Sequence, residues 1–316
     1  MKSVSEAPIS QGTRVFVRCD LDVDIKNGTI SDTYRLESAL PTLKLIIEKG
    51  GIPIIAGHMG KKLSTSLLAP FFDTNLGKQK YELLENLRFD PGEEENSDVY
   101  AQGLANKTQV YVNESFATSH REHASIVGIP KHIQAYAGLN LIKEIETLTK
   151  LLDNPQHPFT VIIGGAKLES KMPVVSKFLE TADNVLLGGR LGLEWKTEVP
   201  EKLKIPSDYA AENRDIGQNT IEEFIKIIQG SKTVLWAGPM GMYEHKAYSQ
   251  GTYAIANEIS YLTKTGDFYS VIGGGDTINA IKKQFPLNDF GFVSTGGGAM
   301  LQFLANGTLP GIVALN

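Results

Sequence analysis

The ten residues VIGGGDTINA, 271 to 280, place three glycines, an aspartate and a threonine directly after an apolar run. Glycine leaves no side chain to pack and costs backbone entropy, so three in a row indicate a tight turn or a close approach of the backbone to another group. Taken alone, the turn has a plainer interpretation, in which Asp276 or Thr277 caps the helix that follows. A single glycine-rich turn is therefore a weak signal of function.

The second half of the chain repeats this arrangement, and the repetition decides the fold class. Five short apolar runs end in glycine and precede a predicted helix: FTVIIGGAK (159–167), NVLLGGR (184–190), TVLWAGPMG (233–241), YSVIGGGDT (269–277) and FVSTGGGA (292–299). Strands that alternate with helices indicate a parallel α/β sheet, whose loops gather at the carboxyl ends of the strands. Small phosphorylated ligands bind at such an edge, because helix N-termini offer unpaired N–H groups.

The first half of the chain is also predicted to be α/β. Apolar runs predict three strands, at 15–20, 52–57 and 109–112. A helix is predicted over 36–49, with Pro41 in an early turn, and another over 139–153. The two halves differ in chemistry, because the second holds the glycine turns and the first holds five of the seven arginines.

These patterns predict an α/β protein of two lobes, each a Rossmann-like parallel β-sheet flanked by helices. We place the first lobe at residues 1–138 and expect the tail 306–316 to pack back on it. The second lobe is 139–305, and it begins with the helix that, with a hinge, joins the two. A chain of 316 residues is long enough for two such cores.

Composition narrows the class of protein. The net charge of −5 argues against a nucleic-acid partner, whose contact surface would be basic. No apolar stretch reaches membrane-spanning length, and the start MKSVSEAPISQGTR lacks the apolar core of a signal peptide. The single cysteine, Cys19, has no partner for an internal disulfide and is interpreted as a small strand residue. We therefore expect a cytoplasmic protein without a membrane partner.

Basic residues at loop-like positions of the first half suggest an anion site. Arg35, Arg88 and Arg121 together with Lys61 would suffice for a pocket that grips phosphate or carboxylate, since guanidinium groups bind such anions through paired hydrogen bonds. The alternative is scattered surface charge.

His58, His120 and His123 raise the question of a metal site. No carboxylate of known metal-ligand spacing accompanies them, so a role as donors to a phosphate fits these histidines better than zinc does.

Seven segments carry a resemblance to a known family. In chain order they are RVFVRCDLDVDIKNGTISDTYRLESALPTLKLIIEKGG, LLENLRF, VNESFATSHREHASIVG, GGAKLESKM, AGPMGMYE, GGGDT and STGGGA. In their order and their amino-acid sequences they resemble segments of the phosphoglycerate kinase family. The resemblance runs from about residue 14 to LPGIVAL at the C-terminus. The resemblance implies the reversible, magnesium-dependent transfer of a phosphoryl group between 1,3-bisphosphoglycerate and ADP in glycolysis. It also implies a hinge-bending monomer, with phosphoglycerate on the first lobe and nucleotide on the second.

The resemblance also implies site residues, carried over motif by motif. The implied glycerate-binding residues are Asp20, Asp22, Arg35, His58, Lys61, Arg88, His120 and Arg121. The implied residues for ATP or ADP are Gly165, Lys167, Lys171, Gly238, Glu244, Gly274, Gly275, Asp276 and Thr277. Asp276 would face the Mg²⁺ that accompanies the nucleotide. The transfer itself is assigned to Arg35, Lys167 and the helix N-terminus at Gly297, which would neutralise charge on the moving group.

The chain departs from the family pattern at several of these motifs. Asp22 and Asp24 replace an asparagine and a proline, and Lys61 replaces an arginine, with loss of its bidentate geometry. Ala237 stands for an asparagine, and Arg190 intrudes at a glycine near the expected adenine pocket.

Two segments are also shorter than the family pattern predicts. The stretch 63–80 looks too short for the strand and helix expected there, and the crossover 191–213 looks trimmed, although 203–213 retains a possible strand. We therefore expect some sheet in each lobe to be missing.

Two functions of different class remain open on the sequence. An active phosphoglycerate kinase is favoured because groups needed only in the transition state are retained, among them Arg35 and Lys167. A non-catalytic relative that binds nucleotide or a partner is favoured by the substitutions at Asp22, Lys61 and Ala237. A dinucleotide-dependent dehydrogenase is a distant third, because no Gly-x-Gly-x-x-Gly opens a helix here.

Overall fold

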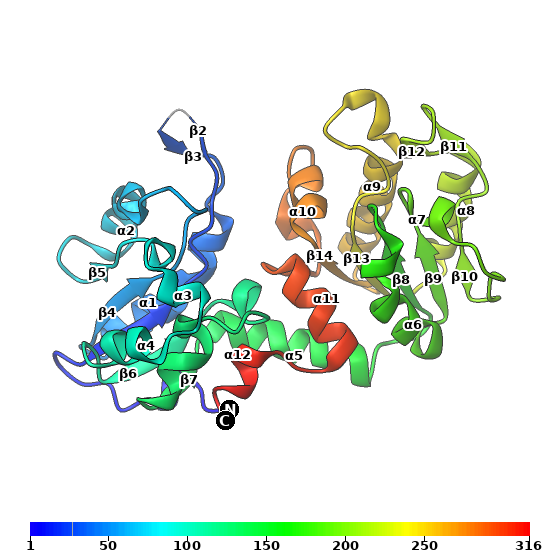
Figure 1. The fold of residues 1–316 in the computed structure, drawn as a ribbon. Coiled ribbons are helices and arrows are strands. Elements are labelled where there is room, and N and C mark those ends of the chain that lie inside the picture. Colours follow the sequence, from blue (N-terminus) through cyan, green and yellow to red (C-terminus); the bar gives the residue numbers. More distant parts are fainter. Residues whose placement is uncertain (27) are drawn as a thin grey trace. The chain divides into compact units, whose positions relative to one another are not determined.

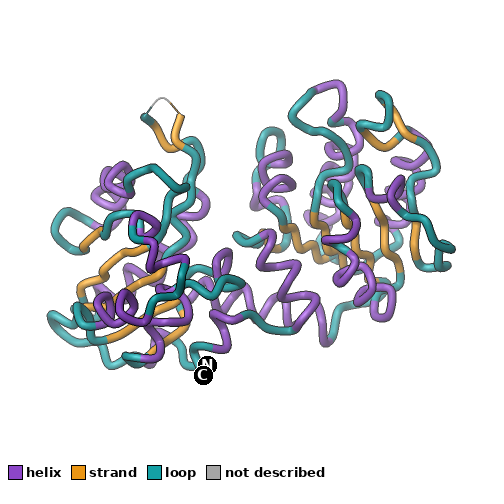
Figure 2. Tube along the Cα trace, in the orientation of Figure 1, coloured by secondary structure: helices purple, strands orange, loops and turns teal. Residues whose placement is uncertain are grey.

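The computed structural model describes residues 1–26 and 28–316, and the chain forms two compact units. Unit 1 comprises Met1–Glu146 and the C-terminal segment Thr308–Asn316, and unit 2 comprises Thr147–Gly307. Helix α5 (Leu139–Asp153) crosses the boundary between them. Both units combine strands and helices throughout, as the colours of Figure 2 show.

Unit 1 is built on a five-stranded parallel sheet in the order β5-β4-β1-β6-β7 (Figure 1). Its strands are β1 (Arg14–Arg18), β4 (Ile52–Ala56), β5 (Glu82–Leu83), β6 (Val110–Asn113) and β7 (Ala135–Ala137). The chain runs from β1 to β4 on one side and later to β6 on the other. The strand order therefore reverses between β1 and β6, and ligands of open α/β sheets bind at such a reversal.

The helices of unit 1 are mostly short. They are α1 (Tyr34–Glu48), α2 (Ala69–Leu76), α3 (Pro91–Glu94), α4 (Asp98–Ala105) and α12 (Pro310–Val313). A two-stranded antiparallel ribbon, β2 (Ile25–Lys26) with β3 (Thr29–Ile30), lies between β1 and α1 in sequence. The last helix, α12, packs against the turn Ala124–Gly128 of the same unit.

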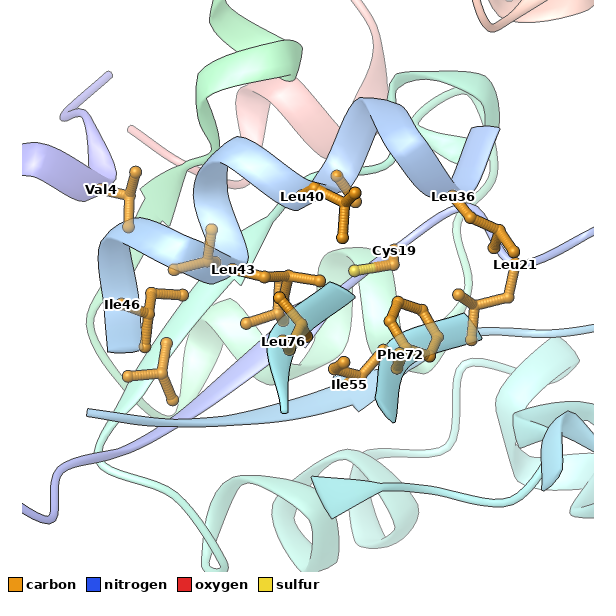
Figure 3. Packing of buried hydrophobic residues seen from close by; sticks show 14 of the residues in the cluster. Val4, Cys19, Leu21, Leu36, Leu40, Leu43, Ile46, Ile55, Phe72 and Leu76 are labelled. Carbon is orange, nitrogen blue, oxygen red and sulfur yellow. The ribbon is translucent and has the colours of Figure 1, made fainter. Parts of the chain in front are cut away.

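Helix α1 is fixed on the sheet by an apolar stripe of helical period. Figure 3 shows this stripe facing the core, with its members Leu36, Leu40, Leu43 and Ile46. Opposite it lie Cys19, Ile55 and Phe72, all fully buried. Each buried aliphatic side chain contributes roughly 1.5–3 kcal/mol, so the stripe sets the rotation of α1. That rotation in turn sets the direction of Arg35, beside Leu36 in the first turn.

Unit 2 is built on a six-stranded parallel sheet in the order β10-β9-β8-β13-β14-β15. Its strands are β8 (Phe159–Ile163), β9 (Asn184–Leu187), β10 (Leu203–Lys204), β13 (Thr233–Ala237), β14 (Tyr269–Gly273) and β15 (Phe292–Val293). Every residue of β8 and β13 is buried, as expected for central strands covered on both faces. The strand order reverses between these two strands.

Helices follow most of these strands and cover the sheet. They are α6 (Met172–Thr181), α7 (Leu191–Glu194), α8 (Gln218–Gln229), α9 (Gln250–Thr265), α10 (Gly275–Ile281) and α11 (Gly297–Asn306). A small antiparallel hairpin, β11 (Tyr209–Ala210) with β12 (Asp215–Ile216), stands apart from the main sheet. The five glycine-ending runs of the sequence are β8, β9, β13, β14 and β15, so their turns meet at one edge.

The predicted fold class is confirmed, with corrections at single elements. The caps proposed at Asp276 and Thr277 are wrong, because α10 begins at Gly275 and its N-cap, Gly274, makes no side-chain cap bond. Pro41 lies at the eighth position of α1, not in an early turn, since the helix begins at Tyr34. The missing proline N–H leaves the carbonyl of Glu37 without its helical donor.

The two shortened segments keep their elements in reduced form. Helix α2 lies within 63–80, and strand β5 follows it as a two-residue edge of the sheet. In unit 2, β10 is likewise a two-residue edge strand. The stretch 63–80, which the structure describes throughout, thus holds a helix but no strand, as its length led us to expect, and the strand is found as the short edge β5 directly after it.

Candidate functional site

The carboxyl edge of the sheet in unit 1 gathers the predicted anion-binding residues. Asp20 and Asp22 follow β1, His58 and Lys61 follow β4, and His120 and Arg121 follow the turn after β6. Arg35 lies in the first turn of α1 and Arg88 in the turn Leu87–Phe89. Parallel strands send all these loops to the same side, next to the reversal between β1 and β6.

Arg35 is held at this edge by the loop after β1. Its Nη1 donates to the carbonyl oxygen of Asp22 at 2.9 Å and lies 3.5 Å from Oδ2 of Asp20. Asp20 is almost fully buried; burial raises the pKa of its carboxyl, and the Arg35 guanidinium opposes that rise. Arg35 is partly exposed, so its remaining donors are available to a ligand.

Asp22 connects the loop after β1 with the loop after β4. Its Oδ1 accepts the N–H of Gly60 at 2.8 Å, and its Oδ2 lies 3.8 Å from Nε2 of His58. Burial, followed by the charges of Arg18 and other basic neighbours, lowers the pKa of His58 to about 2. His58 is therefore neutral at pH 7, and its contact with Asp22 is not an ion pair.

Arg18, which sequence reasoning did not select, organises this part of the site. It is fully buried at the end of β1, and its Nη2 lies 3.0 Å from Nδ1 of His58. A guanidinium only donates, so Nδ1 accepts and the His58 proton lies on Nε2. Nε of Arg18 donates to Ser125 Oγ at 2.9 Å, and that hydroxyl donates to Glu93 at 2.5 Å. The detectable signal was an arginine inside an apolar strand, where a charge needs buried partners.

The other basic residues form a cluster with an excess of positive charge. Burial and the neighbouring Arg88 lower the pKa of Arg121, and burial and Arg121 lower the pKa values of His120 and His123. Nε of Arg88 lies 2.9 Å from a carboxylate oxygen of Glu94. This contact is an ion pair and not a hydrogen bond, and the Nε atoms of both Arg88 and Arg121 are buried with no hydrogen-bond partner among the described residues. The positive charges of this cluster destabilise one another, and these two buried donors lack a hydrogen bond. A bound anion would stabilise the charges and accept from the donors.

Lys61 is not joined to this cluster. Its side chain is exposed, and within residues 1–26 and 28–316 no hydrogen bond or ion pair links it to the other predicted site residues. The contacts of the basic cluster in unit 1 therefore centre on Arg18, Arg35, His58, Arg88 and Arg121.

Two adjoining cavities lie at the carboxyl edge of the sheet in unit 2. A smaller one, of about 240 Å³, is lined by Gly164, Gly165, Ala166, Lys171, Ala237, Gly238, Pro239, Gly274, Gly275, Asp276, Thr277, Gly297, Gly298 and Leu301. A larger one, of about 540 Å³, shares four of these residues and adds Gly189, Arg190, Leu193, Glu212, Asn213, Arg214, Gly241, Met242, Tyr243 and Glu244. The smaller cavity lies at the reversal between β8 and β13, where Gly164 and Gly238 continue the two strands.

The glycines of these turns have two different roles. A Cβ on Gly164 would come within 2.2 Å of the Pro239 carbonyl oxygen, and one on Gly297 within 2.5 Å of the Gly274 Cα. These glycines, like Gly238, are required because neighbouring turns pack backbone against backbone. A Cβ on Gly165, Gly275 or Gly298 would meet nothing within 4 Å. Only this second group leaves open space for a ligand.

The smaller cavity suits an anion. Gly275 begins α10 and Gly297 begins α11, so two helices present their N-termini and unpaired N–H groups to it. Lys171 lines the same cavity; burial lowers the pKa of its ammonium, and Asp276 opposes that effect. Thr277 instead accepts the N–H of Gly238 at 2.7 Å and ties two turns together.

The remaining predicted residues take different positions. Glu244 lines the larger cavity. Lys167 is exposed, has φ of +65°, and is outside the lining of both cavities. The structure therefore brings Gly165, Lys171, Gly238, Gly274, Gly275, Asp276, Thr277 and Gly297 together around one cavity.

The residues fit a magnesium ion held jointly with phosphates. Asp276 supplies one carboxylate at the point where the two cavities meet. Among the described residues no group of three or more His, Cys, Asp or Glu side chains is arranged to hold a metal. The described residues thus contain no site in which protein side chains alone would hold the ion. This agrees with the usual binding of Mg²⁺ through one or two carboxylates together with substrate phosphates. In addition, none of the described helices is both long and apolar enough to cross a membrane.

Comparison with known proteins identifies relatives of the whole chain. The family model for phosphoglycerate kinase matches residues 6–75, 69–196 and 193–307. The phosphoglycerate kinase of Leptospira biflexa serovar Patoc is 34% identical, with 96% of each chain covered. That alignment spans 383 positions against 316 residues here, so gaps in this chain account for much of the difference.

Solved structures give the same result. The phosphoglycerate kinase of Coxiella burnetii matches with a TM-score of 0.83 at 28% identity, covering 99% of this chain and 98% of that one. The phosphoglycerate kinase of Pyrococcus horikoshii OT3 matches with a TM-score of 0.86 at 26% identity, covering 100% and 98%.

Proposed function

This chain belongs to the phosphoglycerate kinase family, and from that premise we propose which of its residues serve each half of the reaction. The enzyme transfers a phosphoryl group reversibly between 1,3-bisphosphoglycerate and ADP, giving 3-phosphoglycerate and ATP in glycolysis. The proposal assigns the glycerate to unit 1 and the nucleotide to unit 2. The observation that carries it is the smaller cavity of unit 2, where two helix N-termini, Lys171 and Asp276 converge.

In unit 1, the basic cluster binds the phosphate and carboxylate of the glycerate. The buried Nε of Arg121, which has no hydrogen bond among the described residues, and the lowered pKa values around it support this role, because a bound anion stabilises the charged forms. Arg35 holds the end of the substrate nearest Asp20 and Asp22. Arg18 acts through His58, by keeping its proton on Nε2.

In unit 2, the nucleotide phosphates occupy the smaller cavity and the nucleoside the larger one. Lys171 and the N–H groups of Gly275 and Gly297 neutralise phosphate charge. Asp276 would hold Mg²⁺, which supplies charge neutralisation to the phosphates when it is bound. Glu244, in the larger cavity, is positioned to accept from hydroxyl groups of the ribose.

The transfer step needs alignment rather than a general base. The acceptor is a carboxylate of 3-phosphoglycerate or a phosphate of ADP, and both are already ionised. Arg35, Lys167 and the helix N-terminus at Gly297 stabilise the charge of the moving group. Because Arg35 belongs to unit 1 and the other two to unit 2, we infer that hinge bending completes the site and excludes water. The same proposal holds the protein to be a cytoplasmic monomer without membrane or nucleic-acid partners.

Separate titrations of the two substrates test this assignment. Arg121→Met should weaken binding of 3-phosphoglycerate by roughly tenfold or more and leave the affinity for Mg·ADP unchanged, because it removes one charge-assisted contact. Asp276→Asn should do the reverse. Calorimetry on the full chain measures both, with the exposed Lys226→Ala on α8 as a control. Weakening of both ligands by either variant would contradict the division between the units.

A further inference from the structure

The hairpin β11–β12 forms one wall of the larger cavity, through a turn that the backbone does not favour. Ala211, Glu212 and Asn213 have φ of 51°, 57° and 65°. Glu212, Asn213 and the next residue, Arg214, line the cavity. Residues other than glycine in this left-handed region lose free energy, and a run of three persists only where the surroundings hold it. Within the turn, the N–H of Arg214 donates to the carbonyl oxygens of Ala210 and Ala211, both at 3.2 Å. The position of the turn in the cavity wall depends in addition on contacts outside it.

Arg214 provides the first attachment. Its carbonyl oxygen accepts the N–H of Met242 at 2.9 Å, and Met242 lines the same cavity. Its Nη1 donates to the hydroxyl of Tyr248 at 2.8 Å, and the guanidinium carbon lies 5.0 Å from the centre of that ring. The turn is thus joined to the segment that leads into α9.

Asp215 provides the second attachment, and its side chain is 2% exposed. Its Oδ2 accepts a hydrogen bond from the N–H of Gly251, in the first turn of α9, at 2.9 Å. Its Oδ1 accepts one from the N–H of the next residue, Ile216, also at 2.9 Å. A Cβ on Gly241 or Gly251 would come within 2.3 Å or 2.6 Å of Oδ1. The carboxylate is therefore packed between the hairpin, the cavity loop and α9.

Capping of α9 does not by itself account for a carboxylate at this place. Ser249, at the N-cap position of α9, makes no side-chain cap bond, and its hydroxyl donates to the Lys246 carbonyl instead. Serine is a favoured N-cap residue and would serve there without a buried charge. Burial raises the pKa of Asp215 to about 6, so the chain keeps a group that is unfavourable to bury.

We propose that Asp215 is a positioning residue for the nucleotide: by joining the hairpin to Gly251 and Gly241, it holds Glu212–Arg214 as the wall of the nucleoside cavity. This inference rests on the assignment of the nucleotide to unit 2. Asp276 and Ala166 are shared with the phosphate cavity, whereas the hairpin residues line only the larger cavity. The hairpin wall consequently contacts the base or ribose and not the phosphates.

Steady-state kinetics with Asp215→Asn test the inference. An asparagine retains one acceptor oxygen and loses the other, so at least one of the bonds from the backbone N–H groups of Ile216, Gln250 and Gly251 is broken. The KM for ATP should rise about tenfold, with a matching rise in the dissociation constant for ADP. The KM for 3-phosphoglycerate and kcat at saturating ATP should stay within about twofold, because the phosphoryl-transfer groups are untouched. Asp183→Asn is the matched control, since Asp183 accepts the N–H of Phe159, at the start of β8, at 2.6 Å.

A second variant keeps the test decisive if Asp215→Asn does not fold. Tyr248→Phe removes only the hydroxyl to which Arg214 donates, and it should raise the KM for ATP about threefold with kcat unchanged. An unchanged KM for ATP in Tyr248→Phe, or in a folded Asp215→Asn, would overturn the role of the hairpin wall. A parallel rise in both KM values would overturn it too. Wild-type protein that binds no ADP would instead refute the assignment of the nucleotide on which the inference rests.

Discussion

The two lysines that follow β8 differ in their surroundings. Lys171 lines the phosphate cavity, and burial lowers the pKa of its ammonium while Asp276 opposes that effect. Lys167 lies outside both cavity linings, exposed and with positive φ. Strained backbone of this kind recurs at functional positions, where the surroundings enforce it. We propose that Lys171 binds the nucleotide in the ground state and that Lys167 acts on the transferring phosphoryl group.

Lys167→Ala should therefore reduce turnover far more than nucleotide affinity. A donor that acts only in the transition state is worth about 2.7–4 kcal/mol, a loss of roughly 10²–10³ in kcat. The dissociation constant for ADP should change by less than about threefold, or ~0.6 kcal/mol. Lys226→Ala on the exposed face of α8 should change neither value. Equal losses in binding and turnover would identify Lys167 as a ground-state ligand.

In the proposed glycerate site, Asp22 would place a second carboxylate beside a highly charged substrate. It should weaken binding, because each like-charge pair at ~4 Å costs about 1 kcal/mol in water and up to ~4 kcal/mol in a partly desolvated cleft. Asp22→Asn keeps an acceptor for the Gly60 N–H and removes the charge. The KM for 3-phosphoglycerate should fall at least fivefold, or ~1 kcal/mol. The exposed Asp24→Asn is the control, and an equal effect of both variants would assign the change to long-range charge alone.

Three consecutive glycines before Asp276 suggested a turn that binds phosphate. The structure places this turn at a cavity, and phosphate binding there stays a prediction. The sequence did not show which glycines leave open space for a ligand and which, such as Gly164, are packed against a neighbouring turn. That difference depends on contacts between residues that are distant in the sequence. Arg18 was missed for the same reason, since its partners His58 and Ser125 are distant in the sequence.

At the level of elements, helix α5 begins on a buried carboxylate. Glu114 directly follows β6 and accepts the N–H of Asn140 at 3.0 Å, while Thr42 accepts that of Leu139 at 2.8 Å. Burial raises the pKa of Glu114 to about 8 in spite of these bonds. A Cβ on Gly138 would come within 1.5 Å of Oε2 of Glu114, so the glycine before α5 leaves the space that the carboxylate occupies.

This carboxylate predicts a pH dependence of stability. The folded pKa of about 8 exceeds the ordinary glutamate pKa of 4.5, so the folded state binds the additional proton between these values and stability falls as pH rises. Glu114→Gln should remove a slope of about 1.4 kcal/mol per pH unit between roughly pH 5 and 8. Urea unfolding at several pH values measures it, with the exposed Glu146→Gln on the same helix as the control. Parallel pH profiles of wild type and Glu114→Gln would contradict the burial argument.

The elements themselves were largely predictable, and their ends were not. Helix α5 occupies the predicted residues, because its apolar residues recur at helical spacing over its whole length. Helix α1 begins before the predicted start, since the polar residues Tyr34 and Arg35 carry no periodic signal. The two-residue edge strand β5 was missed because its identity comes from a neighbouring strand, not from its own sequence, whereas β10 lies at the start of the stretch 203–213 in which a strand was considered possible.

For the whole molecule, the division of donors between units predicts closure on substrate binding. Arg35 belongs to unit 1 and Lys167 to unit 2, and both are assigned to one transferring group. The radius of gyration in solution should therefore fall when 3-phosphoglycerate and a non-hydrolysable ATP analogue are both present. Either ligand alone is the control and should change it less. An unchanged scattering profile in a protein with measurable turnover would refute hinge bending.

The most direct measurement of the central claim is the rate at which the purified full chain forms ADP from ATP in the presence of Mg²⁺ and 3-phosphoglycerate. The account predicts turnover that requires all three components and that falls by roughly 10²–10³ in Lys167→Ala, whose fold and ADP binding are retained. A chain that binds ADP and 3-phosphoglycerate but forms no ADP beyond the rate without 3-phosphoglycerate would contradict the account and would establish a non-catalytic relative.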